Sequence, residues 1–539
     1  MQASGGGVDF DWLVVGSGFG GSVSTLRLAE KGYKVAVLER GRRFAPETLP
    51  RSTWDFRNFF WLPRLGLRGI TRVRPFRHAW MVSASGVGGG SLNYAATLYR
   101  APNAFFRHPQ WAGLEDWQSA LAPHYDSAEK MLGVQTVPFE SDGARFLKEV
   151  GQAFGVQDTF RRTPCGVYFG EPGKAVADPY FGGKGPQRSG CTRCGACMVG
   201  CRVGAKNTLD RNYLWLAERK GATILPEHFV TDIRPIGAAD GSDGYFVTTE
   251  RPGAWLDKRR RQFRCRGVVV AAGAVETNRL LLHCRTMGSL PAISDLLGTL
   301  VRTNSESILA VKMPANTKLE LWRDVGNSAS IFTSPDTHVE FCTYGEGGDA
   351  MATFFTLMVG KGTSITRPLK LLGSILRHPI AFLQTLWPIG WSRRTAVLLV
   401  MQSLDNAISF KAHRRLFGNG IRVTSKPDPL NPAPSYIEAA QRVASWLAKR
   451  HGAVAQSALP EALLNVPSTS HILGGAPIGR DATTGVLDRH NRVFGYENLL
   501  VCCGAAMPTN PGVNPALTIT ALAEHAMSKV PPAAGTPSV

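Results

Sequence analysis

The first forty residues alternate between apolar and glycine-rich stretches in a pattern typical of a strand, a turn, a helix and a second strand. Residues 13–15 are a short apolar run, residues 22–31 carry apolar side chains at helical spacing, and residues 34–38 are apolar again. A repeat near 3.6 residues favours a helix, whereas a short continuous apolar run between turn signals favours a buried strand. Residues 12–40 therefore predict a βαβ unit.

Three glycines separate the first predicted strand from the helix with the spacing G-x-G-x-x-G. Gly16 suits a tight turn, Gly18 lets a pyrophosphate approach the backbone, and Gly21 lets the helix pack against the strand. The N–H groups at the start of the helix would face the negative ligand. Glu39 stands at the end of the second strand, where an acid binds adenosine ribose hydroxyls. The unit predicts a dinucleotide site and leaves FAD and NAD both open.

The same order of elements recurs later in the chain. Residues 206–220 have helical spacing, residues 268–272 are wholly apolar, and Gly273 then leads into a helical pattern over 275–284. Residues 499–503 are a further apolar run. This recurrence is expected where a split dinucleotide-binding domain resumes.

Two more helices follow from local signals. Residues 117–132 have helical periodicity, with Pro123 as an early break, because proline lacks the N–H that a helix interior needs. Residues 514–529 predict a closing helix, with Asn514 as its N-cap and Pro515 at its first helical position.

A different pattern occupies the middle of the chain. Residues 306–358 alternate in short β-like runs, which suits an antiparallel sheet in a second lobe. Residues 361–401 then present apolar faces edged by arginine, and Pro379, Pro388 and Arg393 argue against a membrane-spanning helix. This basic amphipathic segment is open to two interpretations, a core helical hairpin or an interfacial or lid segment.

The amino-acid composition and net charge limit the classes of partner that the protein could bind. The chain has 61 Lys and Arg against 41 Asp and Glu, a net charge of +20. Because the basic residues are spread through apolar stretches without a recognition module, we expect no nucleic-acid partner and favour an anionic membrane surface. The N-terminus, MQASGGGVDF, lacks the basic start and apolar run of a signal peptide. We therefore expect a cytoplasmic location. Peripheral association with the inner face of the membrane is a further option.

With these elements in place, the chain resembles the glucose–methanol–choline (GMC) family of flavoprotein oxidoreductases, and within it the cholesterol oxidase-like branch. The resemblance covers nearly the whole length. Its carriers are GSGFGGS at 16–22, GVGGGSLN at 86–93, VVVAAGAVETNRLL at 268–281, HILGG at 471–475 and NPGVNPALTITALAEHA at 510–526. Five motifs in this order are far more specific than any one of them.

The resemblance implies FAD and an α/β fold, in which a Rossmann-like FAD-binding domain is built from discontinuous segments beside an α+β substrate lobe with an antiparallel sheet. It assigns residues 1–110, 191–305 and 466–539 to the FAD-binding domain, and residues 111–190 and 306–465 to the substrate-binding domain.

One departure is Cys503, which stands where relatives commonly have an aspartate. The implied FAD contacts are Gly16, Gly18, Phe19, Gly20, Gly21, Glu39, Arg40, Gly86, Gly89, Gly90, Ser91, Asn93, Val230, Ala272, Gly273, Gly504, Ala505, Asn514 and Pro515.

The resemblance also implies the catalytic groups. His471 of the H-x-L-G-G motif and Asn514 would handle the hydroxyl of an alcohol while its C–H bond points at flavin N5. Histidine suits proton transfer because its pKa lies near the working pH. Sterol oxidases of the family add a glutamate from the substrate lobe, for which Glu340 is the first candidate and Glu346 the second. The alternative is that both glutamates are solvent-exposed strand residues.

Four of the ten cysteines are bunched together. Cys191, Cys194, Cys197 and Cys201 have the spacing C-x-x-C-x-x-C-x-x-x-C of a bacterial ferredoxin run, but Arg202 replaces the usual final proline. Thiolates at this spacing suit a 4Fe–4S or 3Fe–4S cluster or zinc, and free or disulfide thiols remain open. A cluster would pass electrons to a protein or quinone acceptor, whereas its absence would favour direct reaction with oxygen.

Three functions follow in order of preference. The first is FAD-dependent oxidation of a hydrophobic alcohol, above all a 3β-hydroxysteroid or sterol. The second is a long-chain or terpenoid alcohol dehydrogenase that passes electrons through an iron–sulfur cluster. The third belongs to another class, an electron-transfer flavoprotein without alcohol oxidation.

Overall fold

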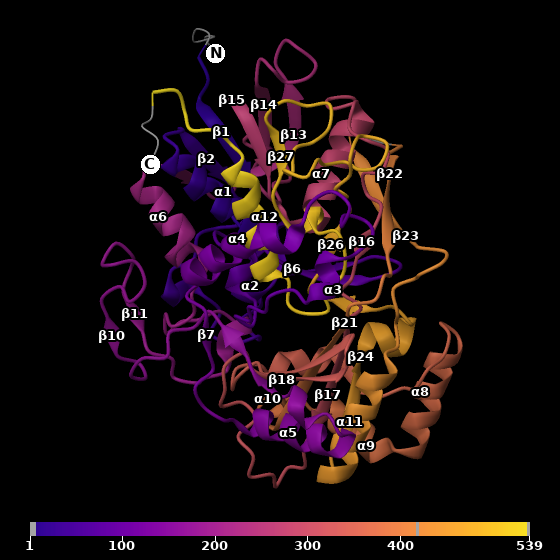
Figure 1. Cartoon of the computed structure of the whole chain (residues 1–539). Helices are drawn as coiled ribbons and strands as arrows, with labels where there is room; N and C mark the ends of the chain where they lie inside the picture. Colours follow the sequence, from indigo (N-terminus) through magenta and orange to yellow (C-terminus); the bar gives the residue numbers. More distant parts are fainter. Residues whose placement is uncertain (1–6, 417–419, 536–539) are drawn as a thin grey trace.

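The computed structural model describes residues 7–416 and 420–535. Strands from three distant parts of the chain form a seven-stranded sheet in the upper part of Figure 1. In spatial order they are β12 (Thr223–Leu225), β2 (Val35–Leu38), β1 (Phe10–Val15), β15 (Arg261–Val270), β14 (Tyr245–Glu250) and β13 (Phe229–Pro235), with β27 (Leu499–Val501) also paired to β15. Residues 1–6, part of the N-terminal stretch considered above, lie outside the described residues.

The pairing in this sheet follows the sequence pattern. β12, β2, β1, β15 and β27 run parallel, and β14 and β13 extend the sheet in antiparallel fashion. β2 and β27 are fully buried, because helices cover them, so their runs are apolar without alternation. The predicted strands at 13–15, 34–38 and 499–503 are confirmed to within a few residues, whereas the strand predicted at 268–272 is the end of β15, which already begins at Arg261.

Helices flank this sheet. α1 (Phe19–Glu30) packs against α12 (Ala516–Ser528) and α6 (Tyr213–Arg219), and α12 packs against α4 (Trp117–Leu132). α7 (Gly273–Met287) lies against β13 and ends at Gly288, whose φ of 85° allows the left-handed end of the helix. The α/β fold class expected from the sequence is confirmed.

A second seven-stranded sheet forms the lower part of the molecule in Figure 1 and is wholly antiparallel. Its order is β20 (Phe355–Leu357), β24 (Val454–Ala458), β17 (Ser307–Lys312), β21 (Thr395–Gln402), β19 (Thr337–Cys342), β18 (Asn327–Ser334) and β8 (Arg161–Arg162). α5 (Asp142–Phe154) and α11 (Glu438–His451) pack on one face of this sheet with a shared apolar core. The predicted antiparallel sheet over 306–358 is confirmed.

Two small sheets join the lobes. β5 (Thr71–Pro75), β6 (Trp80–Ala84) and β25 (Ser468–Thr469) form one. β23 (Ile421–Pro427), β22 (Ile408–Arg414), β16 (Val301–Arg302) and β26 (Leu473–Gly474) form the other. The loop between β25 and β26 carries His471, so both of its ends are tied to a sheet.

The amphipathic segment predicted over residues 361–401 is shorter than expected at its C-terminal end. α8 (Thr366–Arg377), α9 (Pro379–Leu386) and α10 (Trp391–Arg394) make up its first part. Residues 395–401, however, belong to β21, a buried central strand that pairs with β17 and β19. The amphipathic segment therefore ends at Arg394. Within the described residues, no helix combines the length and the apolar character needed to cross a membrane.

Three local predictions were wrong. Pro123 lies inside α4, because caps from Asp116 and Gly133 and packing on α12 outweigh the one missing hydrogen bond. Of the predicted helix at 206–220, only Tyr213–Arg219 is α-helical. The predicted N-cap Asn514 lies two residues before α12, and its side chain donates to Glu340 instead of capping the helix.

Candidate active site

The first glycine turn is shaped by close backbone contacts. A Cβ added at Gly16 would lie 2.6 Å from the carbonyl oxygen of Ala271, and one at Gly20 would lie 1.8 Å from that of Cys502. By contrast, a Cβ at Gly18 would meet no atom within 4 Å. The backbone at Gly18 is thus open on the side of the large cavity described below, as the approach of a pyrophosphate requires.

The second glycine cluster lies directly against the first. Gly89 has a φ of 50°, and a Cβ on it would lie 2.6 Å from the Cα atom of Gly18. The Gly88 N–H donates to Ser17 Oγ over 3.1 Å. Two segments about seventy residues apart in sequence therefore form one continuous backbone cradle.

Glu39 connects these two turns. Its carboxylate is buried and accepts hydrogen bonds from the N–H groups of Ser17 (3.1 Å), Gly41 (2.8 Å) and Gly86 (3.2 Å), as well as from Ser17 Oγ. Glu39 also lines the large cavity. The structure thus shows that Glu39 orders the cradle, whereas its contact with the adenosine ribose stays a prediction.

One large cavity runs from the carboxyl ends of the parallel strands to the second sheet. Most of the predicted cofactor contacts line it. These are Gly16, Gly18, Phe19, Gly20, Glu39, Arg40, Gly89, Gly90, Asn93, Val230, Ala272, Gly273, Gly504, Asn514 and Pro515. Gly21, Gly86, Ser91 and Ala505 do not line it.

The four residues outside the cavity have packing roles instead. Gly21 lets α1 approach the turn, since a Cβ there would lie 2.0 Å from the Gly16 carbonyl oxygen. Gly86 has a φ of 132° and faces Leu92. Ser91 Oγ accepts from the Leu209 N–H, and the Ala505 carbonyl accepts from the Ala476 N–H. These residues hold the walls of the site rather than face its contents.

Cys503, the departure noted from the expected pattern, also lines the cavity. Burial raises the pKa of its thiol, and its Sγ lies 3.3 Å from Thr277 Oγ1. The group at this position is thus a neutral thiol. Contacts to a cofactor here would have to come from backbone groups such as those of Gly504.

The side chains that line the cavity become largely apolar beside the second sheet. There the lining is aromatic and aliphatic, with side chains from β17, β20, β21 and nearby turns, from the short helix α2 (Phe56–Phe59) and from the turn Ala196–Met198. These are Phe59, Phe60, Met198, Ile308, Tyr344, Met351, Phe354, Phe355, Val397 and Leu399. A hydrophobic molecule fits this end of the cavity.

His471 and Asn514 both line the cavity. Behind them lies Glu340, which is fully buried on β19 and accepts from Asn514 Nδ2 over 3.2 Å. The alternative that Glu340 is a solvent-exposed strand residue is therefore wrong. Glu346 is half exposed and pairs with Arg393, but it lies in a turn after β19 and not in a strand.

Sequence reasoning missed Glu306. This carboxylate is buried just before β17, pairs with Nδ1 of His471 and accepts from the Ser470 N–H over 2.7 Å. It pairs with one ring nitrogen of the imidazole and leaves Nε2 uncommitted. In the sequence, Glu306 is only one polar residue in a short polar stretch before an apolar strand, which carries no signal of this role.

Burial and neighbouring charge set the protonation of these groups. Burial raises the pKa of Glu340 to about 8, although hydrogen bonding to Asn514 and the charge of His471 oppose the rise. Burial lowers the pKa of His471, but the charge and hydrogen bond of Glu306 more than offset this and leave it above its usual value. Nearby His338 is kept neutral, because burial lowers its pKa to about 3.

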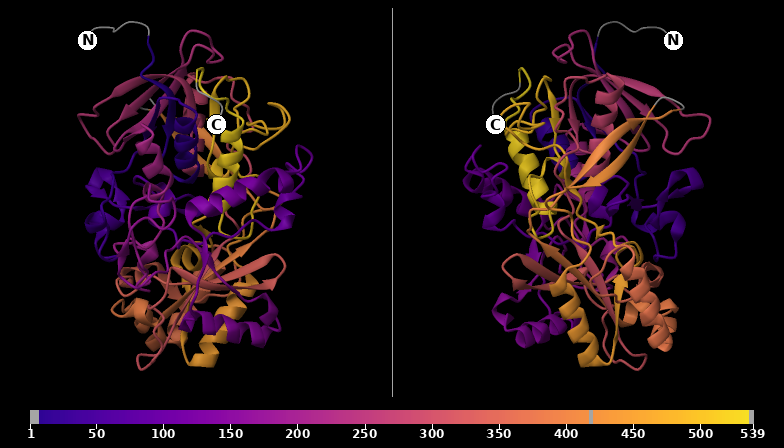
Figure 2. Two further views of the ribbon diagram at one scale, coloured as in Figure 1. Left: turned by 60° about the vertical axis from the view of Figure 1, so that its left-hand side comes forward. Right: turned by 90° about the vertical axis from the view of Figure 1, so that its right-hand side faces the viewer.

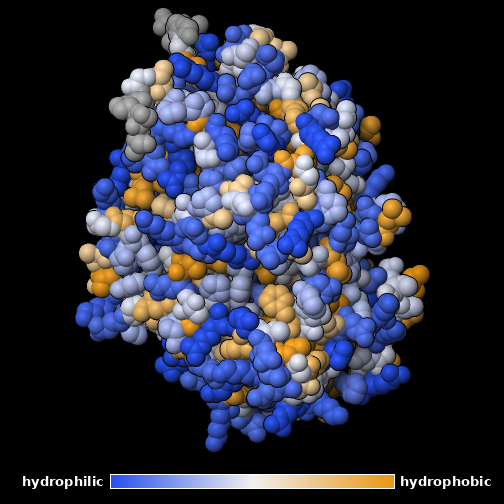
Figure 3. All heavy atoms as spheres, in the orientation of Figure 1, coloured by the Kyte–Doolittle hydropathy of each residue, from blue (hydrophilic) through white to orange (hydrophobic). Residues whose placement is uncertain are grey.

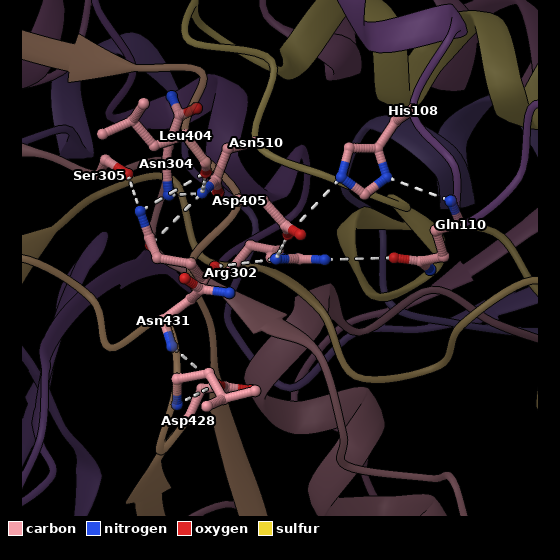
Figure 4. Close-up of polar contacts among 12 residues, drawn as sticks. His108, Gln110, Arg302, Asn304, Ser305, Leu404, Asp405, Asp428, Asn431 and Asn510 are labelled. Carbon is pink, nitrogen blue, oxygen red and sulfur yellow. Dashed lines mark hydrogen bonds and ion pairs between the residues drawn. The ribbon is translucent and has the colours of Figure 1, made fainter.

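The polar network in Figure 4 holds the loops that carry Glu306 and Asn514 together. Asn304, with a φ of 55°, donates through its N–H to Asn510 Oδ1 (2.8 Å) and through Nδ2 to the Val513 carbonyl (3.1 Å). Its Oδ1 accepts from the Gly512 N–H over 3.0 Å. Asn304 thus clamps the loop before Asn514 to the segment that carries Glu306 into β17.

The four bunched cysteines surround a small cavity that Lys206 and Asp324 also line. All four are free thiols, and Cys194 is exposed. Among the residues that the structure describes, no group of three or more His, Cys, Asp or Glu side chains is arranged to hold a metal ion. As they lie, these thiols do not fit a cluster or a zinc ion, and we assign no step to either.

Comparisons with known proteins agree with this geometry. Residues 186–288 and 421–523 match two sequence models described as GMC oxidoreductase, and residues 14–81 match an NAD(P)-binding Rossmann-like domain. A cholesterol oxidase of Mycobacterium tuberculosis is 46% identical over 97% of this chain and 91% of its own length. The chain belongs to the GMC oxidoreductase family. It falls in the cholesterol oxidase-like branch and is an FAD-dependent oxidoreductase that acts on CH–OH groups.

Two further GMC-type comparisons bear on this assignment. A cholesterol oxidase of Acinetobacter baumannii is 42% identical over 97% of this chain and 94% of its own length. Among solved structures, pyridoxine 4-oxidase from Mesorbium loti is similar in fold, with a TM-score of 0.61, 15% identity, and coverage of 96% of this chain and 98% of that one. The latter likeness shows the fold alone.

Proposed function

We propose that this GMC oxidoreductase oxidises the 3β-hydroxyl group of a sterol. One observation carries the proposal: the cavity that aromatic and aliphatic side chains of the second lobe line is also lined by His471 and Asn514. A largely hydrocarbon substrate with a single hydroxyl would bury its rings among aromatic and aliphatic side chains and present its one polar group to these two residues. The similarity to cholesterol oxidases from two bacteria supports the same substrate class.

FAD, when bound in the glycine cradle, supplies the acceptor for the hydride of the carbinol carbon. The chain's own residues handle the hydroxyl proton. Glu306 keeps the proton of His471 on Nδ1, so that Nε2 is free to accept the proton of the alcohol. This arrangement makes His471 the base and Glu306 a positioning residue.

Asn514 would hold the substrate oxygen. One of its amide N–H groups is committed to Glu340, which orients the amide and leaves the other N–H for the alcohol. An N–H aimed at the oxygen stabilises the negative charge that develops as the proton leaves. Glu340 itself does not line the cavity, so we propose that it acts through Asn514.

We further propose the domain division expected from the sequence, with residues 1–110, 191–305 and 466–539 around FAD and residues 111–190 and 306–465 around the substrate. The membership of the two large sheets supports it. The first sheet draws its strands from residues 10–38, 223–270 and 499–501, and the second draws almost all of its strands from residues 307–458.

The two other functions make different predictions. A long-chain or terpenoid alcohol would also suit the apolar cavity, and a dehydrogenase of this kind would need the four cysteines to carry a cluster. Iron and sulfide analysis of the pure protein would test that requirement. An electron-transfer flavoprotein would contain FAD but would not react with any alcohol.

The deciding experiment is anaerobic reduction of the bound flavin. A sterol with a 3β-hydroxyl is expected to bleach the flavin absorbance, and the matched 3-ketone is expected to leave it unchanged. Bleaching by long-chain alcohols but not by sterols would favour the second function. A flavin that no alcohol bleaches would favour the electron-transfer protein and rule out our proposal.

A further inference from the structure

The helical hairpin formed by α8 and α9 presents a large apolar surface to solvent. Nine large apolar side chains between residues 365 and 389 are each more than half exposed, with values from 54% to 74%. They are Ile365, Leu369, Leu372, Leu376, Ile380, Leu383, Leu386, Trp387 and Ile389. Contiguous exposed apolar side chains on this scale mark an interaction site rather than ordinary surface.

The exposed side chains follow helical spacing. Ile365, Leu369, Leu372 and Leu376 lie at intervals of four, three and four residues, which places them on one side of α8. The opposite side, which includes the buried Leu371, packs against β20 and β24. The hairpin is therefore anchored to the protein by one face and leaves the other uncovered.

Other contacts make the hairpin a rigid part of the substrate lobe. The Arg367 side chain is buried and donates to the carbonyl oxygens of Ser435 and Val359. The Lys312 ammonium, at the end of β17, donates to the carbonyl oxygens of Gln384 and Trp387. The exposed face thus belongs to ordered helices, which lie side by side on the outside of the lobe (Figure 2).

The charged side chains of the hairpin segment itself have one sign. Residues 361–394 contain six Lys and Arg and no Asp or Glu. Arg367 is buried and Arg393 is paired with Glu346, whereas Lys361, Lys370 and Arg377 are exposed. An apolar helix face with exposed cations on the same helices complements an anionic lipid surface, because acyl chains receive the apolar side chains and headgroups receive the ammonium and guanidinium groups.

The hairpin is also next to the catalytic cavity. α8 and α9 pack against β20, and α8 packs against the helical turn Pro460–Leu464. Phe355, the first residue of β20, and Pro460 line the apolar end of the cavity. The face of the molecule seen in Figure 3 is largely hydrophilic, with apolar residues scattered over it. The uncovered face therefore lies close to the part of the cavity that would hold the hydrocarbon of the substrate.

We propose that the outer face of α8 and α9 docks the enzyme on an anionic phospholipid bilayer. Both helices are shorter than the roughly 20 residues that cross a bilayer, so they lie in the interface. Docking would bring the apolar end of the cavity near the acyl chains, from which a lipid-dissolved alcohol enters. This consequence for substrate entry rests on the proposed function, whereas the docking itself does not.

The test uses flotation of the FAD-loaded enzyme with vesicles that contain no substrate. Wild type is expected to float with vesicles of phosphatidylcholine and phosphatidylglycerol, and to bind less to phosphatidylcholine alone or at high salt. The triple variant Leu369→Ser, Leu376→Ser and Leu383→Ser removes only exposed side chains and should lower binding about tenfold or more. Its matched control, Trp255→Ser with Leu256→Ser, changes exposed apolar residues of another loop and should bind as wild type does.

Two outcomes would overturn the proposal: wild type that does not float with the anionic vesicles, and a triple variant that floats as well as wild type. A wild type that is dimeric in solution and becomes monomeric in the triple variant would instead assign the face to a second copy of the chain. Because binding is measured without substrate, these outcomes are independent of whether sterols bleach the flavin. A triple variant that oxidises detergent-dissolved substrate normally but vesicle-embedded substrate slowly would support entry from the membrane.

Discussion

At the scale of single residues, two buried carboxylates determine what the histidine and the asparagine at the cavity can do. Glu306 pairs with His471 Nδ1, and Glu340 accepts from Asn514 Nδ2. Neither carboxylate lines the cavity. The groups that line the cavity are thus oriented by carboxyl groups that lie one layer deeper, as is common for histidines that transfer protons.

Replacing Glu306 with glutamine tests this arrangement. The amide keeps the size of the side chain but removes the charge that raises the pKa of His471. Because the protonated imidazole cannot accept the hydroxyl proton, activity falls at low pH, and we expect this acidic limb of kcat/KM to move to lower pH in Glu306→Gln. We also expect kcat to fall about 10- to 100-fold. Glu346→Gln, at an exposed position, is the control and should behave as wild type; an unmoved acidic limb in Glu306→Gln would contradict the role.

Glu340 predicts a pH dependence of stability. Its pKa is about 8 in the folded protein and near 4.5 in the unfolded chain, so the folded state binds more protons between these values. Its contribution to stability is therefore full at low pH and is lost as the pH rises toward 8. The test is the Tm of Glu340→Gln minus the Tm of wild type, measured by thermal unfolding. This difference should be more favourable to the variant at pH 8 than at pH 5. An equal difference in Tm at both values would exclude this titration.

At the scale of elements, the site depends on loops whose ends are fixed by strands. His471 lies between β25 and β26, Glu306 comes just before β17, and Asn514 comes just before α12. Asn304 links two of these loops through three hydrogen bonds. The positions of Glu306 and Asn514 are therefore coupled through one side chain.

Asn304→Gly isolates that coupling. Glycine adopts the positive φ of 55° without cost, so the variant removes the side-chain hydrogen bonds but not the backbone conformation. We expect the free energy of unfolding to fall by about 1–3 kcal/mol, and kcat to fall with little change in flavin content. Asn498→Gly, at an exposed asparagine with a φ of 52°, is the matched control. Unchanged kcat in Asn304→Gly would show that the clamp does not position the site.

At the scale of the whole molecule, the cofactor cradle exists only because distant segments meet. The turn around Gly18 and the cluster around Gly89 touch, and Glu39 bonds to both segments. β15 then pairs with β1 and β27, which brings Gly273 and Gly504 to the same cavity.

Gly89→Ala should therefore separate the two turns. Its Cβ would lie 2.6 Å from the Cα atom of Gly18, and its φ of 50° disfavours alanine. We expect purified Gly89→Ala to have much less flavin per protein, measured by the ratio of flavin to protein absorbance. Gly66→Ala is the control, because Gly66 also has a positive φ, of 77°, but has open space around the new Cβ. It shows the effect of backbone strain without the effect of a steric clash. Full flavin content in Gly89→Ala would contradict the cradle.

Local pattern by itself determined much of this protein. The βαβ unit, the split return at 268–284 and the antiparallel sheet after residue 306 were all readable, because strands buried under helices are continuously apolar and glycines occur where backbones touch. His471 and Asn514 were found through motifs. Signals of this kind are local, so each can be read from a few neighbouring residues.

Only the tertiary structure decided the rest. Glu306 has no local signal, since its partner His471 is 165 residues away and the pair forms only when the β25–β26 loop meets β17. Asn514 fits the pattern of an N-cap, but a buried carboxyl from β19 competes for its amide. The sequence of α8 and α9 allowed both a core hairpin and an interfacial one, because an apolar helix face does not reveal whether protein will cover it. The fold leaves that face uncovered.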